Sequence, residues 1–478
     1  MLIVVSNQLS REEIRRYSKG RSGYILFNYG EDADVFSKTL ESNGFEHIDL
    51  RNIIINSRGE LRRAVIDFTG ALNTNPPHPD WWAILISRRV AMYEFANALA
   101  KLFIVQKIIE TADWDTIILY DGSISPWNYL RSGKHRIDAK FITLFSMKTD
   151  WQQRLESILP LRTVLWFLKK IVTKTRLGWH PSEIKSNFNA SPVVMFTLIA
   201  KNSFTKERSF KDVYFGDLAK CVEADGYSPV VMGQLHDKLT GDLLNNINSK
   251  KDNSFFLLEH IWSLKDLLSV FKRGLKDFFG REPEWPLSDF AGFDVKEFLN
   301  VNLKWELQAG YTDSLLYYKA TKNILEKISP ELLIYPYENK CTERMFLKAV
   351  SEVSPDTKTI GYQHAVLTPK HIHMFLAKDE SESLPLPDRI VTNGPYTARL
   401  LRETGNYPEG MITAGTALRQ AAEIPDEFIK KESPKRVKNV LLTLAEGVEE
   451  YDKGLAFLRD IQKSNDTGKI DFRVRLHP

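Results

Sequence analysis

The stretch ELLIYPYENKCTERMFLKAVSEVSPDTKTIGYQH, residues 331–364, carries the clearest signal of the fold class. Its first eight residues form an apolar and aromatic run that is typical of a buried strand. NKCTERMF is typical of a helix start, and TIGYQH is a second apolar run that ends in a glutamine and a histidine. A strand, a helix and a strand in this order predict a βαβ unit with two parallel strands.

The same alternation continues in both directions along the chain. Short apolar runs separated by helical patterns predict an α/β fold with mainly parallel sheets and Rossmann-like domains. The predicted strands are Leu2–Val5, Tyr24–Phe27, Ile53–Asn56, Trp82–Ser87, Thr116–Tyr120 and Phe141–Phe145 in an N-terminal set, Val193–Ala200, Pro229–Gly233 and Ser254–Glu259 before residues 331–364, and Asp388–Gly394, Met411–Thr416, Asn439–Gly447 and Asp471–Pro478 after them.

Four regions follow from this pattern. Residues 1–145 form an N-terminal α/β domain, residues 146–190 a basic helical linker, and residues 191–385 a Rossmann-like domain. The proline-rich segment SLPLPD, Ser383–Asp388, is typical of a hinge and leads into a second Rossmann-like domain, residues 386–478.

Composition excludes several classes of protein. The 478 residues are too many for one hydrophobic core, and 43% hydrophobic with 26% charged residues is ordinary for a folded chain. A net charge of +4 gives no case for a nucleic-acid partner. The two cysteines, Cys221 and Cys341, lie far apart without a CxxC pattern, which argues against a disulfide framework and fits the cytoplasm.

One segment has a possible membrane role. LRTVLWFLKKIVTKTRLGW, Leu161–Trp179, mixes apolar residues with Arg162, Lys169, Lys170, Lys174 and Arg176. A basic amphipathic helix can lie on an anionic membrane. The alternative is an ordinary helix whose apolar face packs on the protein while its lysines are solvated.

Residues that directly follow the predicted strands are the candidates for a site, because ligands of open α/β sheets bind beyond the carboxyl ends of the strands. In the C-terminal half these positions hold polar side chains or glycine. They are Tyr335, Tyr337 and Glu338; Gln363 and His364; Asn393 and Gly394; Gly415 and Thr416; Thr443, Glu446 and Gly447; and His477 and Pro478. The GxGxxG fingerprint and the P-loop are both missing from the sequence, which lowers the case for a dehydrogenase or an NTPase.

Several of these motifs, in their order along the chain, resemble bacterial surface-carbohydrate biosynthesis proteins. They are YPYENKCTERMF, IGYQHA, PDRIVTNGPYTARLL, ITAGTALR, LLTLAEG and RLHP, and the resemblance covers roughly residues 193–478. The chain is similar to GT-B glycosyltransferases related to polysialyltransferases and to transferases of 3-deoxy-octulosonic acid. This resemblance implies two Rossmann-like domains that face a cleft, with the acceptor on the side of residues 191–385 and the nucleotide on the side of residues 386–478.

The resemblance also implies site residues. In the polysialyltransferases a His-Pro dipeptide binds the cytidine nucleotide, and His477-Pro478 matches it. The nucleotide-binding set is then Gly415, Thr416, Thr443, Glu446, Gly447, His477 and Pro478. In CDP-glycerol phosphotransferases a histidine after a strand serves as base, and His364 occupies a similar place. Such a domain normally continues beyond the dipeptide, so the C-terminal domain is expected to be incomplete here.

The chemistry of glycosyl transfer fits two of these side chains. A base must take the proton of the acceptor hydroxyl, and a neutral imidazole such as that of His364 suits this task. Glu338 is a second candidate for the base, with Gln363, Tyr337 and Asn393 as substrate contacts. The alternatives are that His364 caps a strand end and that Glu338 lies in the first turn of a helix. His371 and His373 are expected to be wall or surface residues rather than metal ligands.

These observations predict a cytoplasmic glycosyltransferase that builds a surface polysaccharide or a lipid-linked glycan, either free in the cytoplasm or peripheral at the inner membrane. The expected donor is a CMP-linked ulosonic acid and the acceptor a glycan or lipid-linked glycan. No cofactor and no metal are expected, because no DxD-type acidic pair follows a strand in the nucleotide-binding region. The alternatives are a CDP-alcohol phosphotransferase and a non-catalytic subunit of a polysaccharide assembly complex.

Overall fold

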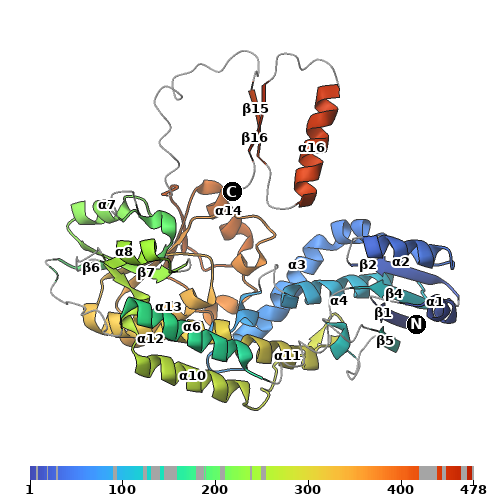
Figure 1. Ribbon diagram of the computed structural model, residues 1–478, viewed down its shortest axis with the longest axis horizontal. Coiled ribbons are helices and arrows are strands. Elements are labelled where there is room, and N and C mark those ends of the chain that lie inside the picture. Colours follow the sequence, from blue (N-terminus) through green and yellow to red (C-terminus); the bar gives the residue numbers. More distant parts are fainter. Residues whose placement is uncertain are drawn as a thin grey trace. The chain divides into compact units, whose positions relative to one another are not determined.

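The computed structural model describes residues 1–6, 9–18, 20–27, 31–89, 94–121, 126–130, 140–144, 159–178, 188, 190–204, 210–236, 239–248, 255–418, 439–443, 448–463 and 471–475. The chain forms two compact units, Met1–Arg419 and Gln420–Pro478. The first unit contains two parallel sheets, of five and seven strands, and the second contains one pair of parallel strands (Figure 1). The predicted α/β class with parallel sheets is therefore confirmed.

The five-stranded sheet is built from the N-terminal part of the chain. Its strands lie in the order β3-β2-β4-β1-β5 and all pair in parallel. The elements in chain order are β1 (Leu2–Ser6), α1 (Arg11–Tyr17), β2 (Ser22–Leu26), α2 (Glu31–Glu41), β3 (Glu46–His47), α3 (Leu50–Thr74), the 3-10 turns η1 (Trp81–Ala83) and η2 (Leu85–Arg88), α4 (Glu94–Thr111), β4 (Thr116–Tyr120), η3 (Trp127–Tyr129) and β5 (Lys140–Leu144).

The seven-stranded sheet holds the candidate site. Its order is β14-β13-β12-β11-β6-β7-β8, with every neighbouring pair parallel. The strands are β6 (Pro192–Ile199), β7 (Ser228–Leu235), β8 (Phe255–Leu257), β11 (Leu332–Pro336), β12 (Lys358–Gln363), β13 (Arg389–Thr392) and β14 (Ile412–Ala414). The chain proceeds from β6 to one side and from β11 to the other. The strand order therefore reverses between β6 and β11, where ligands of such sheets bind.

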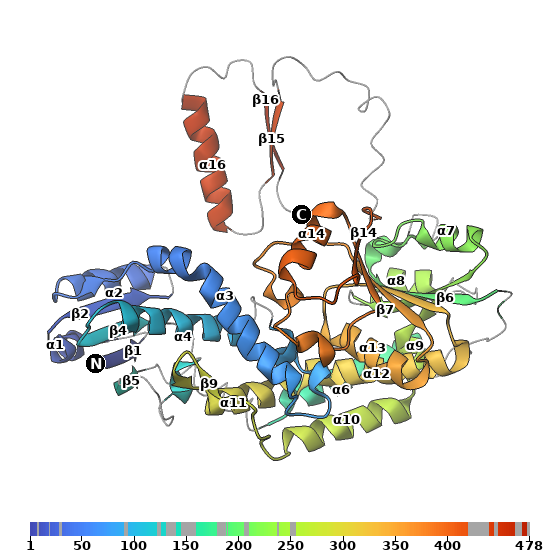
Figure 2. The same cartoon turned by 180° about the vertical axis from the view of Figure 1, so that it is seen from behind.

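Helices cover both faces of this sheet, and successive side chains along each strand point alternately to one face and the other. Val193 and Met195 point toward α7 (Leu218–Ala224), whereas Phe196 points the other way and contacts Phe346 of α13 (Cys341–Val353), with ring centroids 4.3 Å apart. Because both faces are buried, the central residues of the strands are mainly apolar, and the charged residues Lys358 and Arg389 are confined to strand ends. Figure 2 shows this part of the molecule from the reverse side. Its remaining elements, in chain order, are α6 (Leu161–Leu177), η4 (Lys201–Ser203), α8 (Gly241–Asn248), α9 (Leu258–Ile261), α10 (Leu264–Phe278), β9 (Asp289–Phe290), β10 (Phe293–Asp294), α11 (Lys296–Glu306), α12 (Ala309–Ile328), η5 (Ile372–Met374), η6 (Glu380–Glu382) and α14 (Pro395–Thr404).

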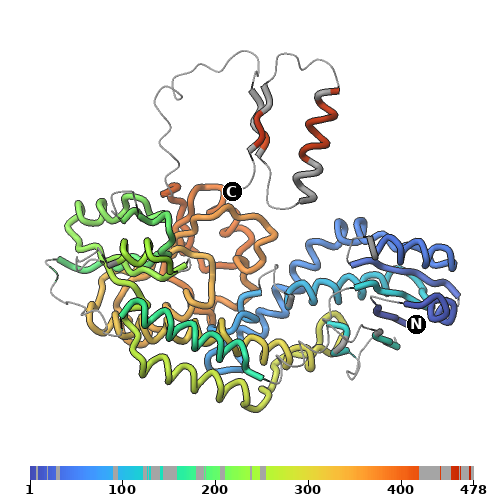
Figure 3. Tube along the Cα trace, in the orientation of Figure 1, coloured from blue at the N-terminus to red at the C-terminus, as the bar shows by residue number. Residues whose placement is uncertain are grey.

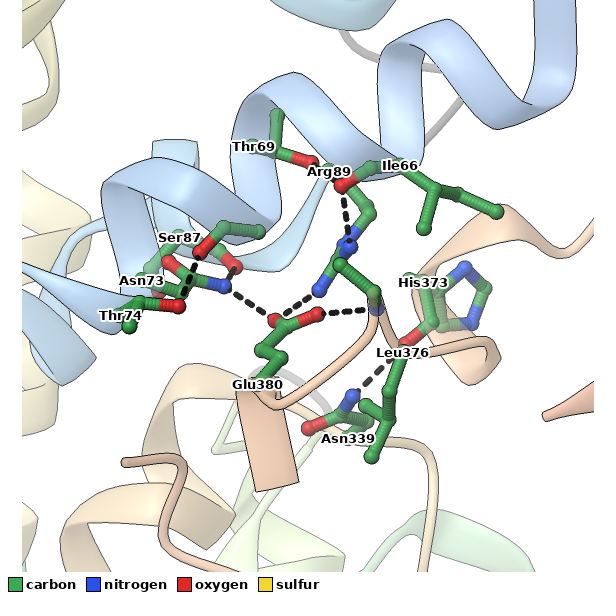
Figure 4. Close-up of polar contacts among 12 residues, drawn as sticks. Ile66, Thr69, Asn73, Thr74, Ser87, Arg89, Asn339, His373, Leu376 and Glu380 are labelled. Atoms are coloured by element: carbon green, nitrogen blue, oxygen red, sulfur yellow. Dashed lines mark hydrogen bonds and ion pairs between the residues drawn. The ribbon is translucent and has the colours of Figure 1, made fainter. Parts of the chain in front are cut away.

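Helix α3 links the two sheets of the first unit. It extends from the five-stranded sheet to the region of η6, as the chain trace shows (Figure 3). At its C-terminal end the carboxylate of Glu380 accepts hydrogen bonds from Asn73 Nδ2 (2.6 Å) and the Ala377 amide (2.7 Å), and it forms an ion pair with Arg89 (Figure 4). Both partners of the ion pair are fully buried, so the residues around η2 and η6 are held together by charge inside the protein.

Two predicted strands of the N-terminal set are wrong. Ile53–Asn56 lies inside α3, because Asp49 caps this helix and the following residues continue it for 25 residues in all. Trp82–Ser87 falls in η1 and η2. In both places the tertiary context overrides the preference of β-branched residues for strands.

The C-terminal strands divide between the units. β13 and β14, which follow the predicted hinge, pair with β12 and with each other in the seven-stranded sheet. The second unit consists of β15 (Asn439–Thr443), α16 (Val448–Lys463) and β16 (Asp471–Arg475), a βαβ unit with parallel strands. The GT-B arrangement of two facing domains stays a prediction.

Candidate functional site

The carboxyl ends of β11 and β12 bring Glu338 and His364 together. The two strands are neighbours in parallel register, so the residues that follow them share one edge of the sheet. His364 Nε2 lies 3.3 Å from Glu338 Oε1. The imidazole is nearly buried, with 5% of its side chain exposed, whereas 29% of the Glu338 side chain is exposed. Glu338 is therefore the accessible member of the pair, with the imidazole behind it.

Positive groups surround Glu338. Lys340 Nζ lies 2.6 Å from the second carboxylate oxygen, and Arg88 Nη2 donates to the Glu338 carbonyl at 3.0 Å. Burial alone would raise the pKa of the Glu338 carboxyl, but the charge and hydrogen bond of Lys340, together with His364 and Arg88, outweigh burial and keep this pKa below its ordinary value. The carboxylate is thus ionised at neutral pH and can hold an imidazolium beside it.

Tyr214 connects this pair to a cavity. Its ring meets the His364 ring edge-on, with centroids 4.7 Å apart. Tyr214 also lines a cavity of about 570 Å³ at the carboxyl ends of β6 and β7, together with Lys201, Asn202 and His236 among others. Asp212 fixes the Tyr214 backbone, since its Oδ1 accepts from the Tyr214 amide at 2.8 Å. Tyr214 therefore contacts both the cavity and the Glu338–His364 pair, next to the switch point of the sheet.

Glu343 holds the loop that carries Glu338. Its Oε2 accepts hydrogen bonds from the backbone amides of Glu338 (3.0 Å) and Lys340 (3.1 Å) at the start of α13. The side chain is completely enclosed, and this burial raises the pKa of the Glu343 carboxyl to about 7. The protonation of Glu343 should consequently affect stability near neutral pH.

We expect Glu343→Gln to flatten the pH dependence of stability. Because the folded-state pKa is raised, the contribution of protonated Glu343 is fully present below its ordinary pKa of 4.5 and is lost as the pH rises through about 7. Urea unfolding at about pH 5 and about pH 8 should show the parental free energy of unfolding fall by roughly 2–3 kcal/mol more than that of the variant. The exposed Glu331→Gln is the control, and parallel curves for the parental chain and Glu343→Gln would refute the expectation.

The predicted substrate contacts take supporting positions. Tyr337 is buried, and its hydroxyl lies 3.1 Å from the Tyr407 hydroxyl. Gln363 is also buried, and its Nε2 donates to the Ala365 carbonyl at 2.7 Å. Asn393 donates through Nδ2 to the His364 carbonyl at 3.2 Å. These three side chains therefore support the loop after β12, and Asn393 positions the backbone of His364 itself.

The predicted nucleotide-binding residues are distributed over both units. Gly415 and Thr416 follow β14 in the first unit, where a Cβ on Gly415 would meet Val391 Cγ1 at 2.5 Å, so close packing on β13 already accounts for this glycine. Thr443 ends β15 in the second unit. Glu446, Gly447, His477 and Pro478 lie outside the described residues.

The two other histidines of the loop after β12 lie at η5, which is a 3-10 turn rather than a strand. The ring Nδ1 of His371 lies 3.0 Å from the Thr368 amide. Burial, together with the nearby Arg88, lowers the pKa of His373 to about 3, so this ring is neutral. Over the described residues, no group of three or more His, Cys, Asp and Glu side chains is arranged to hold a metal ion.

A larger groove, of about 1050 Å³, lies at the opposite edge of the sheet. It is lined by residues that precede β12, β13 and β14, including the predicted hinge Ser383–Asp388, and by the C-terminal half of α13. Helix C-terminal ends attract cations rather than phosphates. We therefore place the candidate site at the carboxyl edge, although its cavity is smaller.

The sequence signals for Tyr214, Lys201 and Arg88 differ. Lys201 directly follows the predicted strand Val193–Ala200 and begins η4, so the rule that ligands bind beyond the carboxyl ends of the strands identifies it. Tyr214 lies farther along the same loop, and Arg88 comes from η2, which precedes α4 in the sequence and contacts α13 in the fold. Only the folded chain brings these last two to the pair.

Comparison with known protein families, curated proteins and solved structures gives no match for this chain. The fold and the site therefore define the class: an α/β protein with parallel sheets and a carboxylate–imidazole pair beside the switch point of the larger sheet.

Proposed function

We propose that the chain is a glycosyltransferase that transfers an ulosonic acid from a CMP-sugar donor to a glycan or lipid-linked acceptor in bacterial surface polysaccharide or lipid-linked glycan synthesis. The observation that carries the proposal is the Glu338–His364 pair, with 3.3 Å between Oε1 and Nε2, at the carboxyl edge of the sheet. The order of motifs along residues 193–478 supports the choice of donor.

In this proposal the pair acts as the base. The acceptor hydroxyl loses its proton to the pair as its oxygen attacks the anomeric carbon, and the bond from that carbon to the CMP phosphate breaks. Glu338 is the accessible member of the pair and takes the proton of the acceptor hydroxyl, and the His364 imidazole behind it, 3.3 Å away, accepts that proton in turn. Glu338 orients the ring and stabilises the imidazolium that forms.

Basic side chains near the cavity suit the leaving phosphate. Lys201 lines the cavity, and Lys340 and Arg88 lie beside Glu338. Such groups stabilise the negative charge that develops on the departing CMP. A phosphotransferase with a CDP-alcohol donor would use the same pair and the same basic groups but attack phosphorus.

Donor turnover separates these reactions. Release of nucleotide should be measured with CMP-activated ulosonic acid, CDP-glycerol and UDP-glucose, each with a membrane glycolipid extract as acceptor. The proposal expects turnover of the CMP donor alone. Turnover of CDP-glycerol alone would establish the phosphotransferase, and no turnover of any donor would favour a non-catalytic subunit.

A further inference from the structure

Helix α6 lies on the protein with Lys170 and Lys174 facing inward. Lys170 Nζ lies 2.6 Å from Asp313 Oδ1, and Lys174 Nζ is fully buried and donates to the carbonyls of Glu259 and His260 at 3.2 and 3.1 Å. Trp166 donates from the same face to Asp313 at 3.0 Å. Two of the five basic residues that suggested a membrane helix are therefore bound inside the protein.

The opposite face of α6 is an exposed apolar stripe, formed by Leu161, Leu165, Leu168 and Val172. Spacings of four, three and four residues place these side chains on one side of the helix. Leu165 is 66% exposed and Val172 59% exposed. The helix thus carries four large apolar side chains outward, in addition to the aromatic residues Trp166 and Phe167 that pack on the protein.

Helix α10 extends this stripe. The two helices lie side by side (Figures 1 and 2), with Phe167 stacked on Phe271 at 4.3 Å between ring centroids. Leu264 and Leu268 are exposed and share the side of α10 that carries Phe271. Half of the large apolar side chains exposed among the described residues lie on these helices or directly beside their ends. We call the stripe of α6 together with Leu264 and Leu268 the apolar face.

The charges around the apolar face have one sign. The exposed charged residues of the two helices are all basic: Arg162, Lys169, Arg176, Lys265, Lys272 and Lys276. The acids of α10 are engaged within the fold. Asp266 accepts from the Ser263 amide at 2.9 Å, and Asp277 binds Arg273 at 2.6 Å and the Tyr311 hydroxyl at 2.5 Å.

We propose that this apolar face inserts into the headgroup region of an anionic lipid bilayer. An exposed apolar stripe marks an interaction surface, and a basic border selects an anionic one. Pairing with a second copy of this chain would set two basic surfaces against each other, which disfavours self-association. No helix in the described part of the chain is long and apolar enough to cross a membrane. The inference does not depend on the proposed reaction.

Flotation of the full chain with vesicles tests the proposal. Binding to phosphatidylcholine vesicles that contain phosphatidylglycerol should exceed binding to pure phosphatidylcholine and should weaken with salt. The triple variant Leu165→Gln, Leu168→Gln, Val172→Gln should lose binding. The triple variant Arg162→Gln, Lys169→Gln, Arg176→Gln should bind the anionic vesicles roughly 100-fold more weakly, at about fivefold for each charge.

The control replaces three exposed apolar residues elsewhere, Val35, Ile55 and Tyr227, with glutamine, and it should float like the parental chain. Circular dichroism of every variant checks folding. The proposal would be overturned if the variant Leu165→Gln, Leu168→Gln, Val172→Gln floated at the parental level. It would also be overturned if the parental chain bound vesicles with and without phosphatidylglycerol equally well. If the parental chain is a dimer, the apolar triple variant is a monomer and neither binds lipid, the apolar face is instead a contact between two copies of the chain.

Discussion

His364→Asn should lower turnover of the CMP donor by roughly 10²–10⁴-fold, the loss expected when general acid-base catalysis is removed. Asparagine keeps a similar size and some hydrogen bonding but cannot take a proton near neutral pH. His364 directly follows β12 and its imidazole is nearly buried, so circular dichroism checks the fold of the variant, while the affinity for CMP should change little. The measurement is steady-state turnover beside calorimetric titration with CMP.

Two further variants make this result specific. Glu338→Gln should also lower turnover, because the imidazolium loses its carboxylate partner at 3.3 Å. His371→Asn is the matched control, since this histidine belongs to the same loop but its ring lies beside the Thr368 amide. Near-parental turnover of His364→Asn together with a large loss in Glu338→Gln would assign the base to Glu338 alone.

Glu380→Gln should reduce the free energy of unfolding by roughly 3–5 kcal/mol, because it leaves the Arg89 guanidinium buried without a counter-charge. The carboxylate of Glu380 also accepts from Asn73 and from the Ala377 amide, so each of its partners is a donor. A glutamine would turn an NH₂ group toward one of these donors and leave it unsatisfied. Urea unfolding measures the loss.

The contribution of this ion pair to the free energy of unfolding depends on pH in the opposite direction from the contribution of Glu343. Burial alone would raise the pKa of the Glu380 carboxyl, but the Arg89 guanidinium, together with the hydrogen bonds from Asn73 and the Ala377 amide, outweighs burial and lowers this pKa. The stability it contributes is therefore present above its ordinary pKa of 4.5 and is lost as the pH falls through the lowered pKa. The control is Asp217→Asn at the exposed Asp217–Lys220 pair, which should change stability by less than about 0.5 kcal/mol. Equal effects of the two substitutions would contradict the structural role of the buried pair.

The rule that ligands bind beyond the carboxyl ends of the strands predicted Glu338 and His364, because the two residues follow strands that are adjacent in the sheet. β11 and β12 are sequential strands and also neighbours, so Glu338 and His364 had to meet at one edge. Tyr214 and Arg88 could not be predicted in this way. Arg88 reaches Glu338 across 250 positions of sequence, a contact that depends on the packing of η2 against the larger sheet.

The errors in the fold have a similar cause. The run Ile53–Ile55 has the composition of a strand, yet Asp49 starts a helix there that the packing of its C-terminal half stabilises. The proline-rich segment before β13 resembles a hinge, but it lines a groove and leads into a strand of the same sheet. The outward apolar stripe of α6 was equally hidden, since the sequence pattern gives the amphipathic face of a helix without saying which side meets the protein.

Hydrogen exchange on the donor complex tests most directly whether the carboxyl edge of the larger sheet is the substrate site. The His364→Asn variant, loaded with CMP-activated ulosonic acid in the absence of acceptor, keeps the donor intact for the measurement. We expect the donor to protect backbone amides in residues 336–340 and 362–366, which contain Glu338 and His364. Protection confined to residues 76–82, 347–359 and 381–388, around the groove at the opposite edge, would contradict it.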